Sequence, residues 1–350
     1  MSEKKKVVVA MSGGVDSTLT ARLLLDAGYD VCGATMFQFD GQDISDAVKM
    51  AAFLGIPHKV IDVRDVYHKI VIQYFIDSYA KGLTPNPCMM CDFHIKFGLF
   101  YDEARKAFDA PYFATGHYAR IVYSPERQKY EVRKGIDAGK DQSYMMYHLN
   151  QDQLAHILFP LGRIWKKDTR RLSHEKGIPV ADKSESQDVC FLTSEASYGE
   201  FLQNHAPHAF KPGDIMDTEG HVLGRHKGIP FYTIGQRKGL GIAAPHPLYV
   251  IALDGEKNRV IVGPNEALFR KRLLATDLDF TDGAAPGKTF ACEAKIRYGI
   301  RTNPCQVTIQ DDGRAVVAFE EAQRAVTPGQ SAVFYEGDRL LGGGTIVRAL

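Results

Sequence analysis

The sequence predicts an α/β protein in which a doubly wound parallel sheet is followed by a small α+β domain and a C-terminal antiparallel β-barrel. Strand-like and helix-like segments alternate through the first third of the chain, the pattern of a parallel sheet. From about residue 206 the chain is dense in Gly, Pro and His, and after about residue 270 short β-like runs follow one another. We therefore expect three domains, with the bounds 1–205, 206–270 and 271–350.

The parallel sheet is predicted from short runs rich in Val, Ile, Phe and Tyr. The expected strands cover residues 6–11, 30–37, 58–63 and 110–119, and the expected helices cover residues 16–28, 44–56 and 95–108. In the first helix Leu19 and Leu23 lie four residues apart, which places them on one face. Ligands of such sheets bind beyond the carboxyl ends of the strands.

The last third of the chain consists of β-like runs separated by turn signals. The runs cover residues 288–300, 305–310, 314–320 and 331–347, with turns at 311–313, 327–329 and 336–338. This spacing is typical of an antiparallel barrel or sandwich, and we expect the barrel.

Composition and charge limit the class of protein. No stretch approaches the roughly 18 apolar residues that would span a membrane, so we expect a cytoplasmic protein with no membrane partner. The formal net charge of +1 indicates no global attraction to nucleic acid, although cations cluster at residues 163–171 and 269–273. Six cysteines in 350 residues do not form a disulfide scaffold. We expect a monomer or a weak oligomer.

A glycine-rich loop joins the first expected strand to the first expected helix, in "VVVAMSGGVDSTLT" (7–20). Backbone N–H groups and a helix N-terminus can surround an anion there, and Ser12 and Ser17 add hydroxyl donors. Asp16 could cap the helix or help to hold Mg²⁺. The lysine of a Walker loop is absent, which favours a loop that grips a departing pyrophosphate while the chemistry takes place at the α-phosphorus. A plain strand-to-helix connector is the alternative.

Two cysteine motifs add a second constraint. Cys88 and Cys91 form a CxxC pair in "TPNPCMMCDFHIKFG", and Cys190 follows "SQD". The pair could be half of a zinc site, a redox pair or two buried thiols, and Cys190 could be a core cysteine.

The chain resembles known adenylating enzymes at these motifs. "SGGVDS" is similar to the loop of the N-type ATP-pyrophosphatases, also called PP-loop or adenine nucleotide alpha hydrolase-like proteins. Seven motifs in series resemble the MnmA family of tRNA-specific 2-thiouridylases. They are "SGGVDS", "TPNPC..CD..IKFG", "ATGHYAR", "GKDQSY", "SESQDVCFL", "YTIGQRKGLGI" and "PGQ".

This resemblance implies ATP-dependent 2-thiolation of tRNA. O2 of the wobble uridine (U34) is adenylated, and sulfur then replaces it at C2, giving 2-thiouridine, AMP and pyrophosphate. Cys91 is implied as the nucleophile and Cys190 as the persulfide carrier, with Asp16 as a further catalytic residue and a sulfur donor protein or sulfide source as partner. The implied ATP-binding residues are Ala10, Met11, Ser12, Gly13, Gly14, Val15, Asp16, Ser17, Met36 and Gly116, with Mg²⁺.

The resemblance also implies contacts with the tRNA anticodon stem-loop. Flipped bases need hydrogen-bonding and stacking side chains, and the cation clusters would face phosphates. His117 could instead be a satisfied histidine at a strand end, and Arg297 and Tyr298 could belong to the outer face of a barrel strand. The implied tRNA-contacting residues are Asn86, Pro87, Cys88, His117, Lys140, Asp141, Gln142, Arg297, Tyr298 and Gln330.

Two residues depart from the family pattern. Cys88 stands where many relatives carry Asp, and Asp92 stands where asparagine is common. A thiol does not replace a carboxylate as a proton carrier, so Cys88, Cys91 and Cys190 could instead hold a [4Fe-4S] cluster with one iron open to hydrosulfide. The persulfide and cluster routes both stay open. The rival functions are another PP-loop synthetase or amidotransferase, and a non-catalytic RNA-binding protein.

Overall fold

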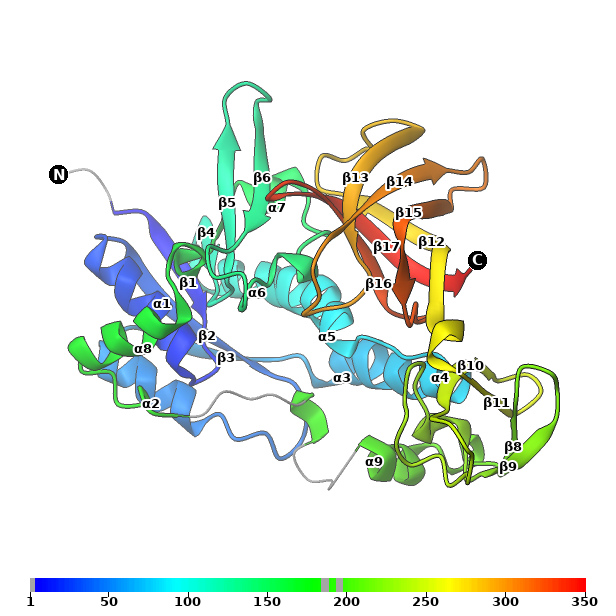
Figure 1. Cartoon of the computed structure of the whole chain (residues 1–350). Helices are drawn as coiled ribbons and strands as arrows, with labels where there is room; N and C mark the ends of the chain where they lie inside the picture. The colour runs from blue at the N-terminus through cyan, green and yellow to red at the C-terminus, as the bar shows by residue number, and fades with distance from the viewer. Residues whose placement is uncertain (1–3, 184–188, 193–197) are drawn as a thin grey trace.

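The computed structural model describes residues 4–183, 189–192 and 198–350, and three sheets organise it (Figure 1). The first is a parallel sheet with the strand order β3-β2-β1-β4-β7. Its strands are β1 (Lys6–Ala10), β2 (Asp30–Phe37), β3 (His58–Asp62), β4 (Tyr112–Ala114) and β7 (Ile157–Leu158). The predicted parallel sheet is therefore confirmed, and its connections change direction between β1 and β4.

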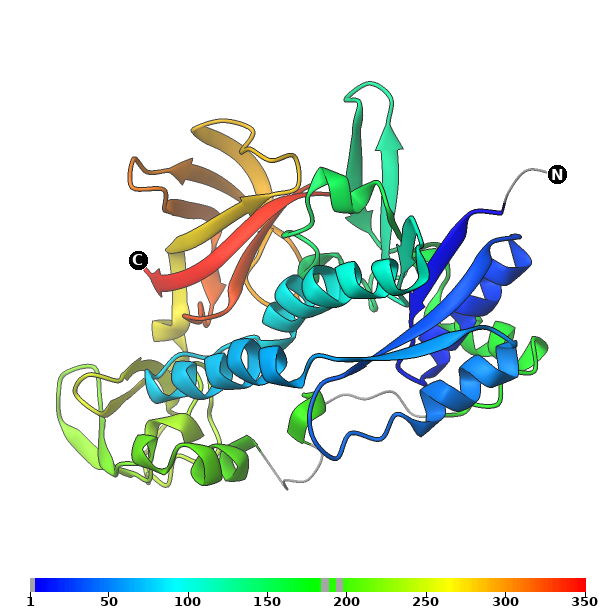
Figure 2. The same ribbon diagram turned by 180° about the vertical axis from the view of Figure 1, so that it is seen from behind.

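Helices cover both faces of this sheet because side chains of β1 alternate between two cores. Val8 belongs to a core with Phe100, whereas Val7 and Val9 belong to a core with Leu24. Figures 1 and 2 show α1, α2 and α8 together on one side of the sheet and α6 on the other. The helices are α1 (Val15–Asp26), α2 (Ser45–Leu54), α6 (Phe100–Phe108) and α8 (Lys166–Glu175).

Two helical segments lie between the parallel sheet and the rest of the molecule. The first was not predicted: α3 (Arg64–Tyr67), η1 (His68–Ile72) and α4 (Gln73–Ala80) follow one another without a break. The second begins earlier than predicted, with α5 (Pro87–Met90) and η2 (Cys91–Leu99) leading into α6. Gly98 has non-helical φ/ψ angles of −101° and −110°, which bends this second segment.

The middle of the chain forms a small four-stranded sheet with the order β10-β11-β8-β9. Its own core contains Ile215, Val250 and Val260, all fully buried. The elements are α9 (Tyr198–His205), β8 (Gly213–Met216), β9 (Val222–His226), β10 (Tyr249–Asp254) and β11 (Arg259–Gly263).

The C-terminal part is an antiparallel barrel, as predicted. Six strands follow the order β12-β15-β14-β13-β16-β17, and pairing of β12 with β17 closes the barrel. The first strand, β12, was not predicted. The strands are β12 (Phe269–Phe280), β13 (Thr289–Lys295), β14 (Asn303–Ile309), β15 (Ala315–Arg324), β16 (Ser331–Glu336) and β17 (Arg339–Ala349).

The barrel and the parallel sheet share one hydrophobic core. Val333, Tyr335 and Leu340 of the barrel belong to the same cluster as Val8 and Phe113 of the sheet. A hairpin of β5 (Ala119–Ser124) and β6 (Lys129–Lys134) extends from the sheet domain and pairs with β17. The short remaining elements are η3 (Ser143–Met145), α7 (Gln151–Leu154), η4 (Pro160–Arg163), η5 (Cys190–Leu192), η6 (Pro207–Ala209), η7 (Ile229–Phe231) and η8 (Asn265–Leu268).

In the described ranges, no helix has both the length and the apolar character needed to cross a bilayer.

Candidate active site

The loop between β1 and α1 is built to leave backbone donors open. Gly14 is the N-cap of α1 and makes no side-chain cap bond, so the first N–H groups of the helix stay available to an anion. The loop is held from within: the N–H of Ser12 donates to Ser17 Oγ at 3.2 Å, and Ser17 Oγ donates to Gly14 O at 3.1 Å. Gly13 has φ +75° and lies so close to α2 that a Cβ would sit 2.6 Å from the backbone nitrogen of Ala47.

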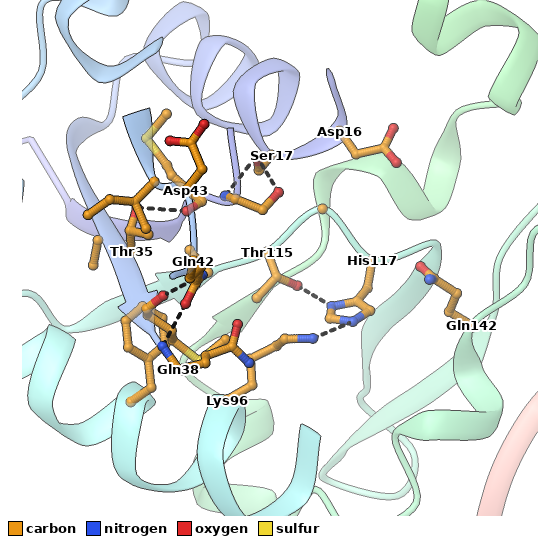
Figure 3. Close-up of a pocket in the computed structure, with 18 residues that line it drawn as sticks. Asp16, Ser17, Thr35, Gln38, Gln42, Asp43, Lys96, Thr115, His117 and Gln142 are labelled. Carbon is orange, nitrogen blue, oxygen red and sulfur yellow. Dashed lines mark hydrogen bonds between the residues drawn. The ribbon is translucent and has the colours of Figure 1, made fainter. Parts of the chain in front are cut away.

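A pocket of about 230 Å³ opens beside this loop, where the carboxyl ends of β1 and β4 diverge (Figure 3). This is where an open α/β sheet with this strand order binds its ligand. Seven of the ten residues expected to bind the nucleotide line it, whereas Gly13, Gly14 and Val15 form the loop behind the lining. The lining residues are Ala10, Met11, Ser12, Asp16, Ser17, Ala34, Thr35, Met36, Gln38, Gln42, Asp43, Ile44, Lys96, Phe100, Thr115, Gly116, His117 and Gln142.

The chain just after β2 supplies one wall that the sequence analysis missed. The backbone N–H of Gln38 donates to Gln42 Oε1 at 2.6 Å, and Gln42 Nε2 donates to Met36 O at 3.1 Å. These bonds fix the turn beside Met36. The sequence did contain a signal for this wall, because polar residues follow the carboxyl end of an expected strand, where such sheets bind their ligands.

A buried ion pair lies at the wall of the pocket. Lys96 Nζ forms an ion pair with Asp92 and lies 3.4 Å from His117 Nε2, while His117 Nδ1 shares a 2.6 Å hydrogen bond with Thr115 Oγ1. Burial alone would raise the pKa of Asp92, but Lys96 and His117 outweigh it and lower that pKa to about 2. Burial would lower the pKa of Lys96, but Asp92 raises it well above its ordinary value. Both groups therefore stay charged at neutral pH and form an ion pair.

His117 stays neutral under the same influences, since burial and then Lys96 lower its pKa. Asp92 is 4% exposed and its charge is balanced by Lys96, so its carboxylate is poorly placed to exchange protons with a substrate. Lys96 was present in the "IKFG" motif, but only the folded chain shows that it lines the pocket.

The three cysteines of the sequence motifs lie within the electrostatic reach of Lys96. Cys91 is 8% exposed and accepts a hydrogen bond from Gln38 Nε2 at 3.7 Å, whereas Cys88 and Cys190 are exposed. Tyr67 OH lies 3.1 Å from Cys190 Sγ. All three are free thiols.

Desolvation raises the pKa of each thiol. It raises the pKa of Cys88 to about 11 and that of Cys91 well above its ordinary value. It also raises the pKa of Cys190, against a lowering by the hydrogen bond from Tyr67. Lys96 lowers the pKa of all three, so one ammonium group both lines the pocket and acts on the thiols.

The residues expected to contact tRNA fall into separate places. Asn86 caps α5, with its Oδ1 accepting from the N–H of Met89 at 3.2 Å, and Pro87 and Cys88 are the first residues of that helix. Gln330 Nε2 donates to Thr84 O at 2.9 Å, so a turn of the barrel holds the chain that leads into α5.

Within the "GKDQ" motif the three residues differ. Asp141 is 6% exposed, and its carboxylate accepts from the N–H of Gly135 and pairs with Lys295 Nζ of the barrel at 3.0 Å. Gln142 lines the nucleotide pocket together with His117, and Lys140 is half-buried.

Arg297 and Tyr298 lie in the turn just after β13, beyond the end of the strand rather than on its outer face. Tyr298 is 47% exposed, and its ring centroid lies 6.2 Å from that of Tyr144.

Family models match almost the whole chain. The description "tRNA methyl transferase HUP domain" matches residues 5–194, "tRNA methyl transferase PRC-barrel domain" matches residues 199–264, and "Aminomethyltransferase beta-barrel domain" matches residues 270–346. The tRNA-specific 2-thiouridylase MnmA of Moorella thermoacetica is 47% identical over 354 residues, which cover 97% of this chain and 98% of that one. The chain belongs to the MnmA family.

Other MnmA proteins match it over the same length. The tRNA-specific 2-thiouridylase MnmA of Heliobacterium modesticaldum is 47% identical over 99% of this chain and 94% of its own. MnmA 1 of Thermoanaerobacter pseudethanolicus is 44% identical over 99% of both chains. The resemblance inferred from seven motifs is thus confirmed along the whole chain.

Proposed function

We propose that this protein is an ATP-dependent tRNA 2-thiouridylase, which adenylates O2 of the wobble uridine and then places sulfur at C2. The observation that best supports this proposal is the position of Lys96. Its ammonium group lines the nucleotide pocket and also lowers the pKa of three neighbouring thiols. One buried cation therefore joins the two half-reactions. A non-catalytic RNA-binding protein has no need of such a bridge.

The nucleotide half of the reaction uses the loop and the pocket. The open N–H groups at the start of α1 would bind the pyrophosphate, and Met36 would pack near the adenine. The carboxylates of Asp16 and Asp43 both line the pocket, and carboxylate oxygens are what Mg²⁺ prefers. These residues fit a nucleotide-bound Mg²⁺, which would neutralise phosphate charge.

The chemical reason for adenylation is the leaving group. O2 attacks the α-phosphorus and pyrophosphate departs, which turns an oxygen that cannot leave the ring into an adenylate. A sulfur nucleophile then forms the C2–S bond, and AMP departs with O2. Lys96 supplies a fixed positive charge beside this exchange, in a site where preformed charge stabilises better than water does.

The sulfur half of the reaction would use the three thiols. In the persulfide route, a sulfur donor protein loads Cys190, which is exposed. The Cys91 thiolate then attacks the inner sulfur, forming a Cys91–Cys190 disulfide and releasing hydrosulfide for C2. An external dithiol would reduce the disulfide for the next turnover.

A [4Fe-4S] cluster also fits the donor set. Cys88, Cys91 and Cys190 offer three thiolates around one cation, and the fourth iron would be left open to bind hydrosulfide. Anaerobic reconstitution followed by absorbance and electron paramagnetic resonance spectroscopy separates the routes. Full activity of the apoprotein without cluster absorbance would remove the cluster.

The tRNA would approach from the side of α5 and the barrel. Asn86 to Cys88 would line the base pocket, with Arg297 and Tyr298 contacting the stem-loop from the barrel. We assign the chemistry to residues 1–205 and a supporting role to the expected domains 206–270 and 271–350. We expect the enzyme in the cytoplasm, where tRNA is found.

The deciding experiment is mass spectrometry of tRNA nucleosides after incubation with ATP, Mg²⁺ and a sulfide source. We expect 2-thiouridine to form, and ¹⁸O placed at uracil O2 to appear in AMP. Cys91→Ser and Cys190→Ser should each abolish thiolation. Cys32→Ser, in β2 and 4% exposed, is the control and should keep it. Absence of label from AMP would contradict the proposed adenylation.

A further inference from the structure

The glycine-rich loop lacks its own lysine, yet a lysine from elsewhere in the chain reaches it. Lys166 is the first residue of α8, and its Nζ lies 2.8 Å from both carboxylate oxygens of Asp16. Asp16 lies in the first turn of α1, directly after the loop, and lines the pocket. Among the described residues that line this pocket, Lys96 is the only lysine or arginine. Lys166 therefore brings a second cation to the loop through its contact with Asp16.

The surrounding contacts aim Lys166 inward. Its backbone N–H donates to Asp137 Oδ2 at 3.0 Å, and its Nζ lies 5.1 Å from the ring centroid of Tyr118. Tyr118 OH donates to Asp16 Oδ1 at 2.8 Å and shares a 2.9 Å hydrogen bond with Thr169 of α8. The side chain of Lys166 is only 12% exposed.

This position separates Lys166 from the other cations of its cluster. The cation run at 163–171 is expected to face tRNA phosphates, yet Lys167 is exposed whereas the side chain of Lys166 contacts Asp16. Adjacent residues of a helix do not share a face, so residues of one cation run can serve two different sites. The tRNA-facing hypothesis then applies to Arg163, Lys167, Arg170 and Arg171.

We propose that Lys166 is the pyrophosphate-binding cation of this enzyme, delivered by α8 and held by Asp16 until the nucleotide enters. Its ammonium group exchanges the single charge of Asp16 for the greater charge of the polyphosphate. The exchange frees the Asp16 carboxylate to face the nucleotide's metal. A lysine binds phosphate as a compact point charge, so it needs no fixed geometry for this exchange.

This inference rests on the proposed function, because it assumes that ATP occupies the pocket. The proposal predicts a difference between ligands in binding affinity that a purely structural ion pair would not produce. A cation for the β- and γ-phosphates strengthens binding of ATP and pyrophosphate and leaves AMP almost unaffected. An ion pair that only holds α8 against α1 would affect the binding of all three ligands alike.

The chain offers a matched control in Lys176. Lys176, just after α8, pairs with Asp26 of α1 at 2.5 Å, so it joins the same two helices far from the loop. We expect Lys166→Met to weaken ATP binding, measured by calorimetry without tRNA, by about tenfold or more, and AMP binding by less than about twofold. Lys176→Met should leave both within about twofold of wild type.

A second variant removes an ambiguity. Lys166→Met leaves the Asp16 carboxylate unpaired, and that charge alone would repel ATP. We therefore compare Asp16→Asn with Asp16→Asn/Lys166→Met, where no such repulsion exists. The proposal requires the double variant to bind ATP and pyrophosphate about tenfold more weakly than Asp16→Asn. Equal affinities would overturn it. Failure of the wild-type protein to bind ATP would instead overturn the proposed function.

Discussion

Asp92 and Lys96 should move thiol reactivity in opposite directions when either one is replaced. Lys96 lowers the pKa of Cys91 and Cys190, and Asp92 raises both. Asp92→Asn should therefore make the thiols more reactive, and Lys96→Met should make them less reactive. Both variants should also be less stable, because each leaves one buried charge without its partner.

The stability loss follows from the pKa of Asp92. The fall of this pKa from 3.8 to about 2 corresponds to roughly 2–3 kcal/mol at neutral pH. The carboxyl contributes this stability fully above its unfolded value and loses it as the pH falls from 3.8 towards 2. Replacing one partner of a buried pair costs about 3–5 kcal/mol in general. At about 2–4 °C per kcal/mol, a loss of this size lowers Tm by about 6–20 °C in either variant.

Two assays test this reasoning. Iodoacetamide alkylation of Cys190, followed by peptide mass spectrometry at pH 8, should be faster in Asp92→Asn and slower in Lys96→Met, because the two charges shift the pKa of this thiol in opposite directions. Cys305, which is buried in the barrel, is the reference thiol. Asp92→Asn/Lys96→Met should recover much of the lost Tm, because it leaves no unpaired charge. Reactivity shifts in the same direction in both single variants would refute the reasoning.

Three further predictions concern the contacts around this centre. Gly329→Ala should lower both thiolation and stability, by about 1–3 kcal/mol, because φ is +90° there and a Cβ would lie 3.0 Å from Thr84 O. Gly313→Ala has φ +81° but open space, so thermal unfolding and activity of the two variants separate backbone strain from the lost contact. Tyr67→Phe should slow alkylation of Cys190 at pH 8, because the hydrogen bond that lowers this thiol's pKa is removed; an unchanged rate would contradict it. The alkylation rate of Cys190 in the wild-type protein should still rise above pH 9, because burial raises the pKa of this thiol from 9.0, and a plateau below pH 9 would be the contrary result.

The parallel sheet could be predicted because its signals are local. The observed bounds of β2 are the predicted 30–37, since a buried strand between a turn and a helix shows itself in its own residues. The helical segment from Arg64 to Ala80 was missed although its sequence carries a helical signal. Buried apolar residues recur there every four positions, at Tyr67, Val71, Phe75 and Tyr79. Strand β12 was missed because its first half, "FRKRL", reads as a charged surface.

The candidate site was only partly predictable for a similar reason. The loop at Ser12–Ser17 carries its function in one short motif, whereas the bridging role of Lys96 depends on how η2 packs beside β4. The contact between Lys166 and Asp16 joins residues 150 positions apart, and no local pattern records it. Spacing along the chain identifies residues that lie close together in one loop. It does not identify residues that meet only because two distant helices pack together.

One turn of the barrel holds the chain that leads to the cysteines. Pro328 O accepts a hydrogen bond from the N–H of Thr84 at 3.0 Å, and Gln330 Nε2 donates to Thr84 O at 2.9 Å. Two residues further on, Asn86 caps the helix that begins with Pro87 and Cys88. A shift of this turn on tRNA binding would therefore move the start of α5 directly. We therefore expect the "PGQ" motif to couple movement of the barrel to the position of the thiols. Gly329, which is buried in this turn, has φ +90° and lies so close to Thr84 that a Cβ would sit 3.0 Å from its carbonyl oxygen.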